Sequence, residues 1–212
     1  RLDGLSLLFA LLISGIGTLV IFYGGEYLHD HPTLPRFYSL TFLFMGAMLG
    51  VVLSGNALIM FLFWELTGIS SFFLIGFEHQ RESARSAAWQ ALLVTGAGGL
   101  AMLAGLVLVG QITSTYDMTQ WVAMAEVIQA SPAGKDAFVL IFLGAVTKSA
   151  PFPFHFWLPN AMEAPAPVSA YLHSATMVKA GLYLMARLFP VFGGLALWQP
   201  LWLLAAAGVW AA

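Results

Sequence analysis

The sequence predicts an all-α polytopic membrane protein with about seven transmembrane segments. Of its 212 residues, 60% are hydrophobic and only 8% are charged, whereas about a quarter of the residues in a soluble domain carry a charge. The apolar residues gather into runs close to the roughly 20 residues that a helix needs to cross a bilayer. A water-soluble fold could not cover its surface with so few charges.

Composition also limits the chemistry of the chain. The formal net charge of −2 gives no reason to expect nucleic acid or an acidic partner. Because the chain has no cysteine, disulfides, iron–sulfur clusters and thiolate metal sites are excluded within it. His29 and His31 lack an evident third ligand, and no phosphate-binding loop, Ser/His/Asp set or HExxH motif is present. We therefore expect neither a cofactor nor a metal.

The apolar runs place the candidate spans in order along the chain: residues 4–23, 36–54, 56–77, 87–110, 136–150, 165–189 and a seventh from about residue 195. Pro32 and Pro35 separate the first span from the second, because proline interrupts a regular helix. A short Ser-Gly-Asn turn leads into the third span, which ends at the charged loop 78–85. The fourth is rich in small residues around 96–99, a composition that favours close helix packing.

The longest polar stretch covers residues 111–135, and an interfacial helix is expected near 118–130. We interpret residues 1–212 as one transmembrane domain, truncated at both ends. Basic residues are balanced between the two ends of the spans, so the positive-inside rule assigns no orientation. The pair Arg81 and Arg85 in one short loop slightly favours a cytoplasmic position for that loop.

Two charged residues lie where a charge is costly. Glu65 lies about 14 Å along its helix from residue 56 and about 18 Å from residue 77, and Lys148 lies about 18 Å from residue 136. A charge near the bilayer centre costs at least about 2.5–3.5 kcal/mol, so it usually faces the bundle interior and marks a pathway. We predict that the two side chains approach within ion-pair distance or share a water. The alternative is a static pair that only joins helices.

The short fifth segment predicts a broken helix directly after Lys148. Pro151 and Pro153 each remove a backbone donor and clash with the preceding turn, after which residues 154–159 continue the apolar run. Broken helices are tolerated where they are buried in protein or line a watery cavity, and transporter sites are often built there. His155, just past the break, is therefore predicted to face the interior and relay protons. A satisfied core histidine is the alternative.

The sixth segment carries two further titratable groups, His173 and Lys179. In a regular helix they would point about 120° apart and lie about 9 Å apart along the axis, so they could link neighbours on either side. Together with the groups at the break they predict a lateral proton route in which waters bridge successive pairs. Glu163 and Arg187 lie near span ends, where a solvated or snorkelling charge is expected.

Three long motifs resemble one known family. Residues 63–77 (FWELTGISSFFLIGF) resemble the glutamate-bearing helix of the large, A-type subunit of the Mrp multisubunit Na⁺/H⁺ antiporter. Residues 147–159 (TKSAPFPFHFWLP) and 161–181 (AMEAPAPVSAYLHSATMVKAG) resemble its next two motifs, and residues 1–6 (RLDGLS) extend the match. The same superfamily includes the antiporter-like subunits of respiratory complex I and of membrane-bound hydrogenases.

The resemblance implies a fold of inverted five-helix repeats, each with one discontinuous helix, of which this fragment would hold the first. It implies that Glu65 and Lys148 form the charge pair of a half-channel, and that His155, His173 and Lys179 pass protons toward a second repeat. Lys179 favours the antiporter, because the complex I relatives usually carry threonine there. The Trp-Glu-Leu-Thr form around Glu65 also resembles the antiporter.

The sequence departs from the family at Asn160, where aspartate is usual, and at Ala166, where threonine is usual. The missing carboxylate at Asn160 bears on proton entry at the cytoplasmic mouth.

We therefore predict a proton-translocating subunit of a multisubunit Na⁺/proton antiporter, which is a secondary transporter and not an enzyme. Its expected partners are other membrane subunits, the lipid bilayer, protons and Na⁺, with no nucleic acid. The expected location is the bacterial inner membrane, as a multi-pass protein. The first alternative is a proton-pumping subunit of respiratory complex I or a membrane-bound hydrogenase, and the second is a scaffold with fixed ion pairs.

Overall fold

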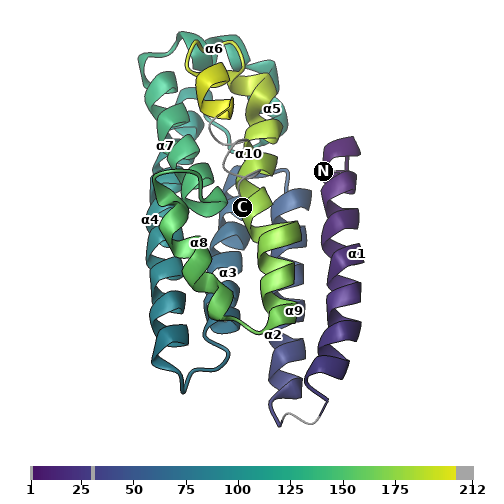
Figure 1. Ribbon diagram of the computed structural model, residues 1–212. Helices are drawn as coiled ribbons and strands as arrows, with labels where there is room; N and C mark the ends of the chain where they lie inside the picture. The colour runs from purple at the N-terminus through teal and green to yellow at the C-terminus, as the bar shows by residue number, and fades with distance from the viewer. Residues whose placement is uncertain (1, 30–31, 204–212) are drawn as a thin grey trace.

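A computed structural model describes residues 2–29 and 32–203, which fold into a bundle of long helices (Figure 1). The α-helices are α1 (Gly4–Tyr27), α2 (Leu34–Leu53), α3 (Ala57–Ile75), α4 (Glu82–Thr113), α5 (Met118–Ala123), α6 (Ala125–Ala130), α7 (Pro132–Ser149), α8 (Trp157–Asn160), α9 (Ala166–Ser169) and α10 (Met177–Phe192). Shorter helical turns are η1 (Phe154–Phe156), η2 (Ala161–Glu163) and η3 (Ala170–Thr176). The described residues form no named strand, so the all-α class is confirmed.

Six helical stretches are long and apolar enough to cross a membrane: Gly4–Tyr27, Leu34–Leu53, Ala57–Ile75, Glu82–Thr113, Pro132–Glu163 and Ala166–Phe192. They correspond in order to the first six predicted spans. Residues 198–203 are again helical, but the rest of the predicted seventh span, residues 204–212, lies outside the described part of the chain.

Helices α1 and α3 are capped at their N-termini by side chains that accept hydrogen bonds from backbone N–H groups. Asp3 accepts a hydrogen bond from the backbone N–H of Ser6 at 3.0 Å, and the Ser6 hydroxyl accepts one from the N–H of Asp3 at 2.9 Å. Asn56 likewise accepts from the N–H groups of Leu58 and Ile59 at the start of α3. Such caps satisfy donors that have no partner inside the helix, and each contributes about 1 kcal/mol.

Helices α4 and α7 pack closely against each other. This agrees with the close packing predicted from the small residues around 96–99. A methyl group on Gly98 would overlap the Thr147 side chain, one on Gly105 would lie 2.6 Å from the Ala137 carbonyl oxygen, and one on Gly144 would lie 2.8 Å from the carbonyl oxygen of Gly98. Glycine at these positions lets the two backbones approach closely. In Figure 1, α4 and α7 run side by side, whereas α1 lies at the edge of the bundle.

The predicted break after Lys148 is confirmed. Helix α7 ends at Ser149, Ala150 has a left-handed backbone (φ 55°), and the Phe152–Pro153 peptide bond is cis. The chain then turns through η1 into α8, so Pro132–Glu163 crosses the bundle in two helical pieces. The segment 118–130, predicted as an interfacial helix, forms two short helices, α5 and α6, that meet at Met124. Its position at a membrane interface stays a prediction.

The sixth span contains a feature that the sequence did not predict. Ala170–Thr176 is a π-helix between α9 and α10, and the Thr176 hydroxyl donates to the carbonyl oxygen of Tyr171 at 2.6 Å. Wide turns of this kind are often found at functional sites. His173 lies within it, so the 120° angle to Lys179 that assumed a regular helix is wrong.

Candidate functional site

Lys148 is the centre of the site. It lies in the last turn of α7, where the helix carbonyls favour a cation, and only 1% of its surface is exposed. Its ammonium reaches across to α3 and donates to the Trp64 carbonyl oxygen at 2.8 Å and to the Thr67 hydroxyl at 2.5 Å. The ammonium also lies 4.3 Å from the centre of the Trp64 ring, a cation–π distance. Its hydrogen-bonding partners are thus neutral oxygens.

Glu65 lies on the same helix as these partners but faces a different neighbour. Its carboxylate rests against Gly99 of α4, where a methyl group would overlap an oxygen of the carboxylate. Trp64 and Thr67 are three residues apart and share the face toward Lys148, whereas Glu65 is rotated by about 100° from Trp64. Glu65 and Lys148 form no direct ion pair within the described structure, although they interact electrostatically.

The predicted direct ion pair is therefore wrong in this conformation, because rotation along α3 turns Glu65 toward α4. The alternative that the two groups share a water stays a prediction. The electrostatic interaction of the two groups, and the position of Lys148 directly before the break, agree with the sequence.

Trp157 connects the break to the sixth span. Its indole N–H donates to the carbonyl oxygen of Thr147 at 2.9 Å, and its ring centre lies 6.4 Å from that of His173. A second hydrogen bond joins the end of α7 to the sixth span: the Ser149 hydroxyl donates to the carbonyl oxygen of Val178 on α10 at 2.7 Å. The end of α7 is thereby fixed against the segment that carries His173.

His173 is buried, with 6% of its surface exposed, and neither ring nitrogen forms a hydrogen bond with a described residue. The ring approaches the backbone of Ala161 without completing such a bond. Unpaired polar atoms inside a protein are costly, so this ring is suited to an additional polar partner. Lys179 is half-buried on α10.

His155 does not face the interior of the described bundle as predicted. It is exposed on η1 and stacks on the ring of Phe152, with 5.7 Å between the ring centres. The reason is that the chain leaves α7 through the turn at residues 150–153 before the short η1 helix begins, so the helical register that would have directed His155 inward is lost.

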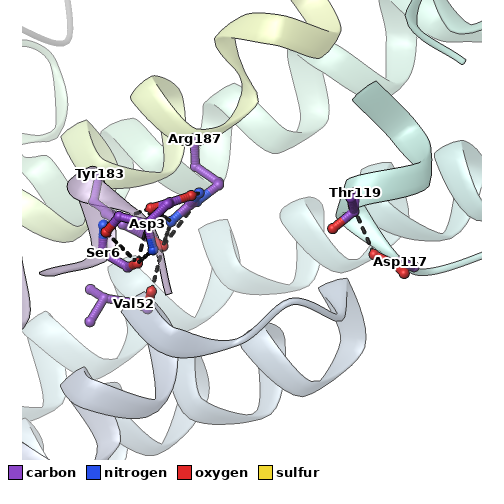
Figure 2. Close-up of polar contacts among 7 residues, drawn as sticks. All are labelled: Asp3, Ser6, Val52, Asp117, Thr119, Tyr183 and Arg187. Atoms are coloured by element: carbon purple, nitrogen blue, oxygen red, sulfur yellow. Dashed lines mark hydrogen bonds and ion pairs between the residues drawn. The ribbon is translucent and has the colours of Figure 1, made fainter. Parts of the chain in front are cut away.

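Arg187 was expected to be a solvated or snorkelling charge, and this is wrong. It is buried and forms an ion pair through both terminal nitrogens with Asp3, the N-cap of α1 (Figure 2). The Tyr183 hydroxyl accepts from Arg187 at 2.9 Å and donates to the carbonyl oxygen of Val52 at 2.7 Å. The hydrogen bond from Arg187 holds the pKa of the Asp3 carboxyl well below its usual range.

Glu163 lies near a span end as predicted and accepts from Arg81 at 2.5 Å and from Ser83 at 3.1 Å. Close to it, the Asn160 amide donates to the Gln90 side chain at 2.6 Å. Asn160 therefore forms a neutral hydrogen bond at a position where the resemblance implies a carboxylate.

Sequence reasoning missed four residues that shape the site: Trp64, Thr67, Gly99 and Trp157. A threonine two residues after a membrane-buried glutamate was the available signal for Thr67. No sequence signal identifies the carbonyl oxygen of Trp64 as an acceptor, because every residue has one.

Comparison with known proteins shows the family of the chain. Residues 54–211 match the family described as NADH:quinone oxidoreductase/Mrp antiporter, TM, and residues 1–38 match that described as NADH-ubiquinone oxidoreductase (complex I), chain 5 N-terminus. The probable A/B subunit of a K⁺/H⁺ antiporter of Rhizobium meliloti (strain 1021) is 51% identical over 209 residues, which are 99% of this chain and 21% of that protein. The A1 subunit of a Na⁺/H⁺ antiporter of Staphylococcus aureus (strain bovine RF122 / ET3-1) is 54% identical over 197 residues, 93% of this chain and 25% of that protein.

A solved structure shares the fold as well as the sequence. A chain in the structure of the Mrp complex from Dietzia sp. DQ12-45-1b superposes with a TM-score of 0.89 at 40% identity, covering 94% of this chain and 22% of that one. The chain thus spans between a fifth and a quarter of the length of these relatives. With a family match over most of its length and a common backbone, the chain belongs to the NADH:quinone oxidoreductase/Mrp antiporter family of transmembrane proteins.

Proposed function

We propose that this chain is the proton-relaying part of the large, A-type subunit of a multisubunit cation/proton antiporter in the bacterial cell membrane. The relatives named above are antiporter subunits and one solved relative belongs to an Mrp complex, which supports a hetero-oligomer with other membrane subunits. The proposed transport exchanges protons for a monovalent alkali cation. Na⁺ is our first choice, although the relatives include both Na⁺ and K⁺ antiporters.

The observation that carries the proposal is the buried ammonium of Lys148. A lysine inside a membrane bundle costs at least about 2.5–3.5 kcal/mol on insertion scales. It is held by the neutral oxygens of Trp64 and Thr67 and not by a bonded carboxylate, so it can lose its proton without leaving a bonded anion behind. Glu65 lies one residue from Trp64 and provides the nearby acid of a two-state centre.

The proposed route leaves Lys148 along the contacts at the break. Trp157 joins the backbone beside Lys148 to the ring of His173, and His173 offers two buried nitrogens without a partner among the described residues. Lys179, on α10 directly after the π-helix, would receive the proton next. His155 has the least geometric support because its ring is exposed.

A second candidate is a proton-pumping subunit of a redox enzyme, because the matching family also includes NADH:quinone oxidoreductase subunits. The two functions differ in what drives proton movement. An antiporter responds to a cation gradient, whereas the redox-driven subunit depends on electron transfer in other subunits.

The test uses the full-length protein in its complex, expressed in a bacterial host that lacks its own antiporters. Everted membrane vesicles are energised with a pH gradient, and the dequenching of a permeant amine dye is followed after addition of Na⁺ or K⁺. The proposal expects cation-dependent proton efflux that Lys148→Gln and Glu65→Gln nearly abolish. Glu126→Gln, at an exposed carboxylate outside the site, should leave it unchanged. Cation-independent, NADH-dependent proton pumping would instead support the second candidate.

A further inference from the structure

Two adjoining recesses lie at the end of the bundle where the loop from α3 to α4 meets the start of α2. One has a volume of about 380 Å³ and polar walls that include Thr33, Glu78 and Gln80. The other has a volume of about 200 Å³ and aromatic walls. Arg36 and His79 line both recesses, so a single ligand can contact the two together.

The arginines at this end differ in how far their charge is neutralised by other described residues. Arg81 is neutralised by Glu78 at 3.2 Å and Glu163 at 2.5 Å. Arg85 instead donates to the carbonyl oxygens of His79 and Gln80 at 2.7 and 3.1 Å. Within the described residues Arg85 forms no ion pair.

The charge of Arg36, like that of Arg85, is not neutralised by a described residue. Its terminal nitrogen lies 3.3 Å from Nδ1 of His79, and its guanidinium carbon lies 5.5 Å from the centre of the Phe77 ring. No carboxylate of the described chain pairs with it. Because a guanidinium carries five N–H donors, Arg36 and Arg85 together present a double positive charge with unused donors, which suits a phosphate group.

The second recess adds an apolar surface directly beside this charge. Phe72 and Trp89 form an edge-to-face pair with 5.1 Å between ring centres. Phe73 and Trp89 are 43% and 54% exposed. Both lie on membrane-spanning helices, so their exposed rings can contact lipid. Aromatic side chains at the ends of spans mark the level of the lipid headgroups.

We propose that this is a binding site for an anionic phospholipid. Its phosphate would lie between Arg36 and Arg85, and an acyl chain would lie along Phe72, Phe73 and Trp89. The polar recess would hold the remainder of the headgroup. Basic sites between transmembrane helices bind anionic headgroups, and the apolar wall is what distinguishes a lipid from free phosphate as the ligand.

The test uses the full-length antiporter complex reconstituted with a phosphatidylglycerol that carries a photoreactive group in its acyl chain. After illumination, labelled peptides are mapped by mass spectrometry. We expect labelling within residues 72–89, competed by unlabelled phosphatidylglycerol but not by phosphatidylcholine or inorganic phosphate. Arg36→Gln and Arg85→Gln should each lower the apparent affinity by about fivefold, as expected for one basic residue near an anionic lipid.

A variant outside the two recesses separates this site from a general effect of charge. Lys135→Gln changes an exposed cation at the start of α7, which lines neither recess, so it should label like the wild type. Equal competition by phosphatidylcholine would reveal an unspecific apolar groove, and competition by inorganic phosphate a free-anion site. Absence of labelling at residues 72–89 would show that another protein segment covers the recess. Each of these three outcomes overturns the proposal, and the competition arms need no variant to assemble.

Discussion

Lys148 and Arg187 are both buried cations in this bundle, yet their surroundings are opposite. Arg187 is held by the two carboxylate oxygens of Asp3 and by the Tyr183 hydroxyl. Lys148 is held by a carbonyl oxygen, a hydroxyl and an aromatic ring. The hydrogen-bonding partners of Arg187 thus include a carboxylate, whereas those of Lys148 are neutral oxygens.

We propose that this difference separates a charge with a structural role from one that takes part in proton transfer. A bidentate arginine–carboxylate pair fixes geometry, and here it joins the start of α1 to α10 across 184 positions of sequence. A lysine on neutral acceptors can change its protonation state or its partner, and Glu65, the residue next to Trp64, interacts with it electrostatically. We therefore interpret the Arg187 pair as a clamp and the Lys148 centre as the switch.

The largest effect on stability is expected at the clamp. Arg187→Gln would remove the guanidinium from the Asp3 carboxylate, and removal of one partner from a buried pair costs about 3–5 kcal/mol. Because the Asp3 side chain is 29% exposed, we expect a smaller loss of about 2 kcal/mol. Thermal unfolding of the purified complex measures this, while transport per assembled complex should stay near that of the wild type. A stable variant with abolished transport would contradict the assignment as a clamp.

The pH dependence of the same clamp follows from the lowered pKa of Asp3. A carboxyl whose folded pKa is depressed stabilises the fold fully above its unfolded pKa, about 3.9, and loses this contribution as the pH falls through the folded value. The difference in unfolding temperature between the wild type and Asp3→Asn should therefore stay constant between about pH 6 and pH 8. A difference that changed within this range would show that another group titrates with the pair.

A smaller effect, on transport, is expected at Thr67. Thr67→Val removes one acceptor of the Lys148 ammonium and leaves a buried donor unpaired, at a cost of about 1–3 kcal/mol. We expect transport to fall by about tenfold or more and its pH profile to move, because the change acts on the protonation of Lys148. Thr67→Ser restores the hydroxyl and should recover most of the activity. A pH profile that Val and Ser leave equally unchanged would assign Thr67 to packing alone.

Gly99 offers a test of how the Glu65 carboxylate is positioned. A methyl group at Gly99 would overlap that carboxylate, whereas one at Gly96, on the same helix, meets no atom within 4 Å. Since Glu65 can turn away from the added methyl, we expect Gly99→Ala to lower transport a few-fold with little change in unfolding temperature. Gly96→Ala should match the wild type in both measurements. Equal transport in the two variants would show that the carboxylate needs no fixed position.

The sequence predicted those parts of the molecule that depend on local composition. Runs of apolar residues located six spans, and two prolines located the break after Lys148. Features that depend on rotation or on distant pairing were missed. The direction of Glu65 follows from the angular position of α3 against two neighbours, and the pairing of Arg187 with Asp3 joins opposite ends of the chain. The π-helix around His173 has no periodicity signal that distinguishes it from the flanking α-helix.

The smallest effects separate the members of the proposed route. His173→Ala and Lys179→Ala should each lower proton-coupled transport while the complex assembles normally, because His173 is buried beside Trp157 and no residue in the described chain satisfies its nitrogens. His155→Ala should have a weaker effect, since its ring is exposed and stacks on Phe152. Dye dequenching in vesicles with matched amounts of assembled complex ranks the three variants. If His155→Ala causes the greatest loss, the proton leaves Lys148 through the exposed face of the break, and the contact between Trp157 and His173 is only packing.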